Sequence, residues 1–138
     1  MPTDIAITVT NRQGRICASS GSKWEPKMGY SRAVRSGNFI AVTGTVGIGA
    51  DGRYSPSLRE QTARSLAIIQ AAVEALGGRV DQIIRTRMFV TDISKWEEVA
   101  AAHGALFGEI RPATTIVEVA KLIDAEARIE IEADAVVG

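Results

Sequence analysis

RPATTIVEV, residues 111–119, places the end of a helix directly before a strand. Pro112 lacks the backbone N–H that a helix interior needs, so it ends the segment that precedes it. Behind it, the β-branched residues Thr115 and Val117 recur at every second position, as side chains on one face of a strand do. The stretch therefore predicts a helix-to-strand junction in which Thr114 opens the strand.

The first of two predicted helices lies near the middle of the chain. It begins with a capping box at Ser57 and Glu60, where each side chain can accept a hydrogen bond from a free backbone N–H of the other residue. It ends at the glycine pair Gly77–Gly78. Its apolar stripe consists of Leu58, Leu66, Ile69, Val73 and Leu76.

The second predicted helix precedes the opening stretch. Ser94 and Glu97 predict another capping box, and the helix runs from there towards Pro112. Its apolar stripe consists of Trp96, Val99, His103, Phe107 and Ile110. We expect Trp96 in the core or at a subunit boundary, where Trp96→Ala would cost roughly 3–5 kcal/mol if the indole is fully buried. We expect His103 to be a packing histidine.

Alternating apolar residues predict the strands. They are expected at residues 31–35, 39–46, 82–90, 113–119 and 127–137, with a less clear strand at 5–10 or 16–19. The expected apolar residues are Ile84, Met88 and Val90 in strand 82–90, and Ile129, Ile131, Ala133 and Ala135 in strand 127–137. The order of the elements predicts an α+β fold, a two-layer sandwich with a mixed β-sheet and both helices on one face.

The other face of the sheet is predicted to carry charge. Arg85 and Arg87 lie on one strand, and Glu130, Glu132 and Asp134 lie on another. A solvated surface is the simplest interpretation for a monomer. Apolar residues interrupt the charges, however, so the face also suits burial against another subunit.

The composition limits the class of protein. The chain has 138 residues, of which 46% are hydrophobic, which suits one domain over residues 1–138. Cys17 is the only cysteine and has no metal-ligand partner at suitable spacing, so neither an intramolecular disulfide nor a metal site is expected. No apolar run is long enough to cross a membrane and no signal region is evident, so we expect a cytoplasmic protein without a membrane partner.

The charges balance but are unevenly distributed. Sixteen basic and sixteen acidic residues give a net charge of zero, which argues against nucleic acid as a partner. Residues 1–36 hold six basic and two acidic residues, whereas residues 92–138 hold four basic and ten acidic residues. We expect the fold or an assembly to bring these two parts together.

Five stretches of the sequence stand out together: GYSRAVRSG (29–37), FIAVTGTVG (39–47), RTRMFVTDISKWEEV (85–99), RPATTIVEV (111–119) and IEIEADAV (129–136). Together they resemble the Rid/YjgF family of reactive-intermediate deaminases, which are small homotrimers with a chorismate-mutase-like fold. Their order and spacing carry the resemblance. Residues 1–28 match poorly and are expected to form an N-terminal extension or edge strand.

The resemblance implies a small-metabolite site in clefts between the subunits of a homotrimer, with no cofactor. It implies that Tyr30 flanks the ligand, that backbone groups at Gly44 hold it and that Glu130 orients an attacking water. The arginine with which the family clamps a substrate carboxylate falls on Thr114. Strand alternation places Thr114 on the face away from the helices, so we expect its side chain to point into the cleft.

Threonine at the clamp position changes the expected chemistry. Arginine pairs both oxygens of a carboxylate with its planar fork, whereas threonine offers one neutral donor. Truncating one member of a buried charge pair typically costs ~2–5 kcal/mol. We therefore expect an arginine-lacking branch of the family that binds a carbonyl- or imine-type ligand without sustaining the standard hydrolysis of 2-imino acids.

Two other functions stay open. The chain could be an active imine or enamine deaminase, a hydrolase in which Arg32 or Arg87 replaces the clamp, although ordinary ion pairing is the alternative for each arginine. It could also be an endoribonuclease, a label often attached to the family, but no basic track with stacking aromatic residues is evident. Glu130 also has an alternative to the catalytic role, because it could simply be one carboxylate of the charged face.

Overall fold

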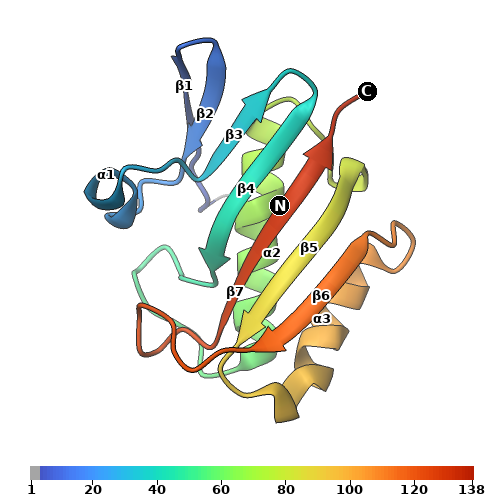
Figure 1. The fold of residues 1–138 in the computed structure, drawn as a ribbon. Helices are drawn as coiled ribbons and strands as arrows, with labels where there is room; N and C mark the ends of the chain where they lie inside the picture. Colours follow the sequence, from blue (N-terminus) through green and yellow to red (C-terminus); the bar gives the residue numbers. More distant parts are fainter. Residues whose placement is uncertain (1–3) are drawn as a thin grey trace.

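A computed structural model describes residues 4–138 as one seven-stranded sheet with two helices packed on one face (Figure 1). In spatial order the strands are β1 (Thr8–Arg12), β2 (Arg15–Ser19), β3 (Ala33–Ser36), β4 (Phe39–Val46), β7 (Ile129–Val136), β5 (Ile83–Val90) and β6 (Ala113–Glu118). Neighbouring strands are antiparallel except β5 and β6, which run parallel. The predicted α+β fold with a mixed sheet is confirmed.

The helical layer consists of α2 (Leu58–Ala75) and α3 (Trp96–Phe107), which lie behind the sheet in Figure 1. A third, short helix, α1 (Trp24–Met28), was not predicted and lies beside the N-terminal strands, away from this layer. Turns of 3₁₀ helix at Val80–Gln82 and Ile93–Lys95 lead into β5 and α3. Within residues 4–138, no helix has the length and apolar character needed to span a membrane.

The N-terminal strands form a hairpin that extends the sheet beyond β3. The sequence left open whether a strand lies near residues 5–10 or 16–19; both regions contribute a strand, and the two pair with each other. Gln13 and Gly14 connect them with φ angles of 56° and 84°. Positive φ at both central positions is typical of the tight turns that match the twist of a hairpin.

Helix α2 follows its sequence prediction closely. The side chain of Ser57 accepts a hydrogen bond from the backbone N–H of Glu60, but the Ser57 N–H donates to the Ser55 hydroxyl (3.1 Å), so only one half of the predicted capping box forms. The helix ends before Gly77, whose φ is 86°. The five residues of the predicted stripe are all buried. They pack against buried side chains of the central strands, such as Ile40 and Ile131, so the core lies between α2 and the middle of the sheet.

The start of α3 differs from its prediction. Ser94 does not cap the helix, because it belongs to the preceding 3₁₀ turn, where its backbone N–H donates to the Asp92 carboxylate (3.1 Å). The helix begins at Trp96, whose side chain is 52% exposed, whereas Val99 and Phe107 are buried. Trp96 is therefore not in the core of the single chain, where Trp96→Ala should cost well below the ~3–5 kcal/mol of a buried indole. Its expected place at a subunit boundary stays a prediction.

A bulge at the start of β5 changes which side chains face the core. The pairing with β7 shifts between Ile83 and Arg85, so one residue is added to β5 at this point. Ile83 is buried, and Ile84, which the alternation placed on the apolar face with Met88, is 49% exposed. The prediction for Ile84 is wrong because a strict two-residue period cannot anticipate a bulge.

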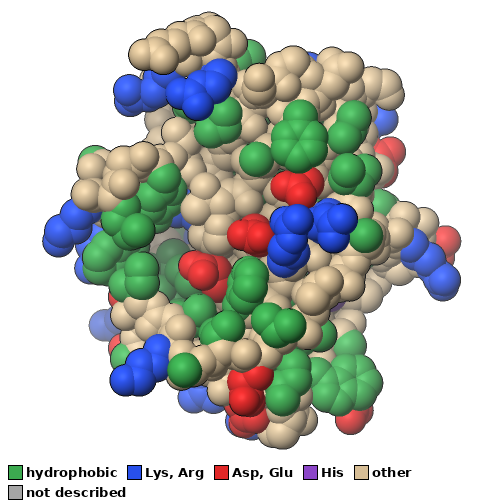
Figure 2. All heavy atoms as spheres, in the orientation of Figure 1, with side chains coloured by type: hydrophobic (Ala, Val, Ile, Leu, Met, Phe, Trp, Pro, Cys, Tyr) green, Lys and Arg blue, Asp and Glu red, His purple; other side chains and the backbone are tan. Residues whose placement is uncertain are grey.

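The face of the sheet opposite the helices, called here the open face, carries an ion-pair cluster (Figure 2). Arg87 Nη1 lies 3.2 Å from the Glu132 carboxylate and 3.4 Å from the Asp134 carboxylate, and Arg85 Nε lies 4.0 Å from Asp134. The predicted charged face is confirmed, and within the chain the arginines of β5 pair with carboxylates of β7. Exposed apolar side chains, including Phe39, lie on the same face.

Candidate functional site

Four of the six predicted site residues lie together where β4 meets β7. The pairing of these strands shifts between Val42 and Thr45, so Gly44 lies in a bulge next to Glu130. A Cβ atom on Gly44 would lie only 2.9 Å from Glu130 Cδ. The absence of a side chain at residue 44 therefore leaves the space that the Glu130 carboxyl group occupies.

Glu130 has the environment of a proton-accepting group. Burial raises the pKa of its carboxyl group, the charge of Arg32 opposes that rise, and the nearby Glu132 adds to it. A carboxylate whose pKa is raised in this way is a better proton acceptor than an exposed one, provided that it is still ionised at the working pH. This environment suits a proton acceptor, and the role of Glu130 in orienting a water stays a prediction.

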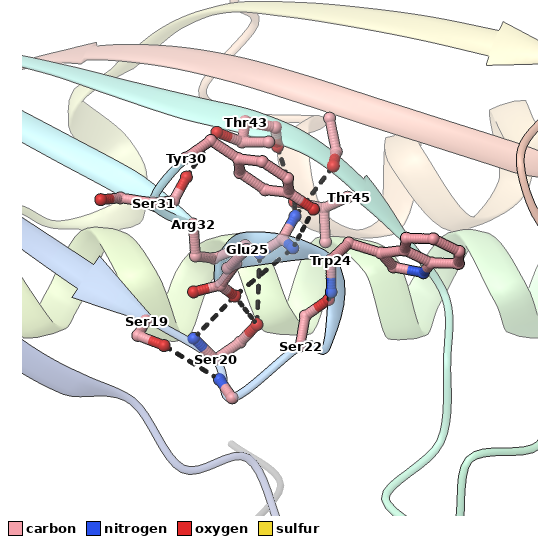
Figure 3. A network of polar contacts seen from close by, with 12 residues as sticks. Ser19, Ser20, Ser22, Trp24, Glu25, Tyr30, Ser31, Arg32, Thr43 and Thr45 are labelled. Carbon is pink, nitrogen blue, oxygen red and sulfur yellow. Dashed lines mark hydrogen bonds and ion pairs between the residues drawn. The ribbon is translucent and has the colours of Figure 1, made fainter. Parts of the chain in front are cut away.

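Arg32 is buried beside this carboxylate, and its guanidinium is engaged within the chain (Figure 3). Its Nε donates to the Ser20 hydroxyl (3.2 Å), and its Nη1 donates to the Gly44 carbonyl oxygen (2.8 Å) and the Thr45 hydroxyl (3.2 Å). Its Nη2 lies 3.5 Å from the Glu25 carboxylate. These partners favour internal pairing over the role of a substitute anion clamp.

Tyr30 adjoins the cluster and a large groove. Its hydroxyl oxygen accepts a hydrogen bond from Arg32 Nη2 (3.5 Å), and its ring centroid lies 5.6 Å from the guanidinium carbon. The groove, of about 770 Å³, lies between the β1–β2 hairpin and α1, and Tyr30 and Thr43 are among its lining residues. Glu130 is not among the lining residues, so the groove does not contain its carboxylate.

Arg87 and Thr114 lie apart from these four residues. Arg87 belongs to the ion-pair cluster of the open face. Thr114 is on β6, in register with Thr86 of β5, and the two hydroxyl oxygens are 2.9 Å apart. Thr86 Oγ1 is also 2.9 Å from His103 Nε2 of α3, so Thr114 faces the helical layer.

The predicted orientation of Thr114 is therefore wrong. The alternation in β6 was assigned to the wrong faces: Ile116 packs against the core, whereas Val117 is exposed. β6 lies parallel to β5 with Thr114 opposite Thr86, and paired residues in a sheet point to the same side. Thr114 remains exposed to solvent because β6 is the last strand of the sheet.

The hydrogen bonds that connect Thr114 to Thr86 and Thr86 to His103 were not predicted from the sequence. Burial lowers the pKa of His103, and its ring packs on Phe107 with centroids 4.6 Å apart, in agreement with a packing histidine. The Thr114 hydroxyl also donates to the Pro112 carbonyl oxygen at 3.3 Å. All contacts of the Thr114 hydroxyl within the chain are thus with neutral groups.

Glu25 is the other residue that the sequence did not reveal. It is 4% exposed and lies in α1, where its carboxylate accepts from the backbone N–H and the hydroxyl of Ser20 (3.2 and 2.7 Å). Burial raises its pKa, but the serine hydroxyls and the charge of Arg32 outweigh that effect and hold the pKa below its ordinary value. Among residues 4–138, no group of three or more His, Cys, Asp or Glu side chains could hold a metal.

Comparison with known proteins gives a consistent result. Residues 21–137 match the family model described as Endoribonuclease L-PSP. The 2-iminobutanoate/2-iminopropanoate deaminase of Escherichia coli is 36% identical over 111 residues, which cover 78% of this chain and 86% of that protein.

Solved structures agree with this match. The crystal structure of Rv2704 from Mycobacterium tuberculosis, described as a member of the YjgF/YER057c/UK114 family, is 44% identical. It superimposes with a TM-score of 0.83 over 89% of this chain and 99% of its own. The E. coli YjgF gene product gives a TM-score of 0.73 at 36% identity, over 78% of this chain and 87% of its own. On the evidence of the matched residues and the shared fold, the chain belongs to the Rid/YjgF family.

Proposed function

We propose that the chain forms a homotrimer with small-metabolite sites in the clefts between subunits, where it binds a carbonyl- or imine-type ligand. We further propose that it does not sustain the standard hydrolysis of 2-imino acids. One observation carries this proposal: the clamp position holds a neutral threonine, and both arginines that could replace the clamp already have carboxylate partners.

The charges around each arginine support the loss of the clamp. Arg32 is paired with the buried Glu25, and Arg87 lies between Glu132 and Asp134. A substrate carboxylate would have to displace one of these partners and leave it without its counterion. The Thr114 hydroxyl can replace its long 3.3 Å bond to the Pro112 carbonyl with a bond to a ligand oxygen, which suits an uncharged carbonyl group.

The positions of the site residues support a site shared between subunits. Glu130 lies on the open face together with Glu132 and Asp134, whereas Thr114 faces the helical layer on the outermost strand. Within one chain the two residues are therefore on opposite sides of the sheet. A cleft that contains both needs a second copy of the chain.

Light scattering at micromolar concentration should report about three times the chain mass of 14.7 kDa. The open face combines ion pairs with exposed apolar side chains, a composition suited to burial in an interface. Phe39→Asp puts an extra charge on this face and should lower the measured mass. A wild-type monomer at that concentration would contradict the proposal.

The wild-type chain should show negligible hydrolysis of imines generated from simple amino acids by an amino-acid oxidase. The E. coli deaminase, assayed in the same mixture, provides the positive control. Titration with pyruvate and with its uncharged ester, methyl pyruvate, tests the ligand class: the ester should bind at least as tightly. Imine hydrolysis at the rate of the E. coli deaminase would overturn the proposed loss of activity.

An active imine or enamine deaminase is the second candidate, and the name of the E. coli relative favours it. In that case the assay above would give hydrolysis that depends on Glu130. An endoribonuclease is the third candidate, supported by the description of the matched family model. RNA cleavage that persists as the salt concentration is varied would favour it over both others.

A further inference from the structure

We infer that Arg32 is a positioning residue, which fixes the Gly44 carbonyl and the Glu130 carboxylate, and that Glu25 of α1 holds Arg32 in place. The inference rests on the proposed function, because it assigns a role within the same site. It also makes α1 a support of that site, although this helix lies outside the two-layer core.

The first observation is the geometry of the guanidinium. Its three nitrogens point in different directions: Nε to Ser20, Nη1 to the Gly44 carbonyl and Nη2 towards Glu25 (Figure 3). A planar guanidinium held on several edges cannot rotate without breaking several hydrogen bonds. Arg32 therefore acts as a rigid brace between α1 and the bulge of β4.

The second observation concerns the bulge. The β4–β7 pairing skips residues 43 and 44, and the Gly44 carbonyl oxygen accepts its hydrogen bond from Arg32 Nη1 at 2.8 Å. The bond fixes the peptide plane at Gly44, against which the Glu130 carboxyl group lies. The conformation of the bulge and the position of the carboxylate are thus set by the same arginine.

The third observation is the charge balance. Arg32 and Glu25 are 6% and 4% exposed, so neither ion is shielded by water. A buried charge needs a partner, and removing one member of a buried pair is strongly destabilising. Glu25 supplies the counterion that lets a cation remain buried beside Glu130, and Arg32 in turn opposes the effect of burial on the Glu130 pKa.

The loss of Arg32 should change the pKa of Glu130 in a defined direction. An opposite charge close to a carboxyl group favours its ionised form, so removing the charge disfavours that form. The Glu130 pKa, already raised by burial and by Glu132, would rise further. Glu130 would then hold its proton at a higher pH, and the pH range in which it can accept a proton from water would become narrower.

The test follows the Glu130 carboxyl carbon by NMR as the pH is varied, with the signal assigned by its absence in Glu130→Gln. Arg32→Gln alone leaves Glu25 buried without its partner and can prevent folding. The double variant Glu25→Gln/Arg32→Gln removes both charges and avoids that problem. The midpoint of the Glu130 titration should move to higher pH in the double variant and return towards the wild-type value in Arg32→Lys, which retains the positive charge.

Arg35→Gln is the matched control. Arg35 lies in β3, which begins directly after Arg32. Its guanidinium also holds parts of the fold together, since Nη1 donates to the Leu76 carbonyl oxygen at the end of α2 (2.8 Å) and Nε to the Gly37 carbonyl oxygen (2.9 Å). Its loss should lower stability without moving the Glu130 midpoint. If Arg32 contributed to stability alone, the variants of both arginines would lose stability without a change in the Glu130 midpoint.

The titration needs no ligand, so its outcome is separable from the proposed function. An unchanged Glu130 midpoint in the folded double variant would overturn the inference, whatever the protein binds. A shifted midpoint in a protein that binds neither pyruvate nor methyl pyruvate would uphold the role of Arg32 and reject the ligand proposal.

Discussion

Thr114→Arg should tighten the binding of pyruvate by roughly thirty-fold to several-thousand-fold, the range that corresponds to ~2–5 kcal/mol for a buried charge pair. The substitution places a planar cationic fork at the position where the family carries its carboxylate clamp. The larger side chain has room, because Thr114 is exposed on the outermost strand. Thr86 would keep His103 as its hydrogen-bond partner. Isothermal titration calorimetry with pyruvate measures the change.

Thr115→Arg is the control for the added charge. Thr115 is the next residue of β6, in register with Arg87, so its side chain points to the opposite face of the sheet. It should give no comparable gain in pyruvate binding. Thr114→Arg could assemble as the wild type does and still bind pyruvate no more tightly. The cleft would then differ from that of the family in more than the missing arginine, and the assignment of Thr114 to the clamp position would fail.

Gly47→Ala should lower the free energy of unfolding by about 3 kcal/mol or more. Gly47 is buried where β4 turns towards α2, and an added Cβ atom would lie 2.1 Å from the Gln61 carbonyl oxygen. That oxygen belongs to the helix backbone, so the clash cannot be relieved by rotating a side chain. The Gln61 side chain also holds two loops, through the Ser55 and Glu126 carbonyl oxygens.

Urea unfolding monitored by circular dichroism provides the measurement, and Gly104→Ala provides the control. Gly104 lies within α3, and an added Cβ atom would meet nothing within 4 Å. Alanine is the better helix former, so this substitution should stabilise the chain by about 1 kcal/mol. A loss of less than ~1 kcal/mol for Gly47→Ala would show that α2 can move away from β4 without penalty.

Local signals predicted local structure well. The Ser57 N-cap and the glycines at 77–78 set the ends of α2, because a cap depends on residues within one turn of the helix. Ile84 and Thr114 were assigned to the wrong faces because a face is decided by the register with a neighbouring strand. Register depends on partners far away in the sequence.

The candidate site was likewise predicted only in part. Tyr30, Gly44 and Glu130 came from the family resemblance, and the fold brings them together. The ion pair of Glu25 with Arg32 was missed because nothing in the composition around residue 25 indicates that a glutamate is buried there. Only the hydrogen bond of Glu25 with Ser20 and its ion pair with Arg32 reveal it.

The position of β7 has a consequence for how the protein folds. This strand follows the other six in the sequence but lies between β4 and β5, and its pairing joins Phe39 to Val136. A ribosome must therefore synthesise residues 129–136 before the two halves of the sheet can join. Until then β4 and β5 each expose an unpaired edge and an apolar face, which are features that promote aggregation. The nascent chain should consequently depend on rapid release and on chaperones more than a protein whose sheet grows strand by strand in sequence order.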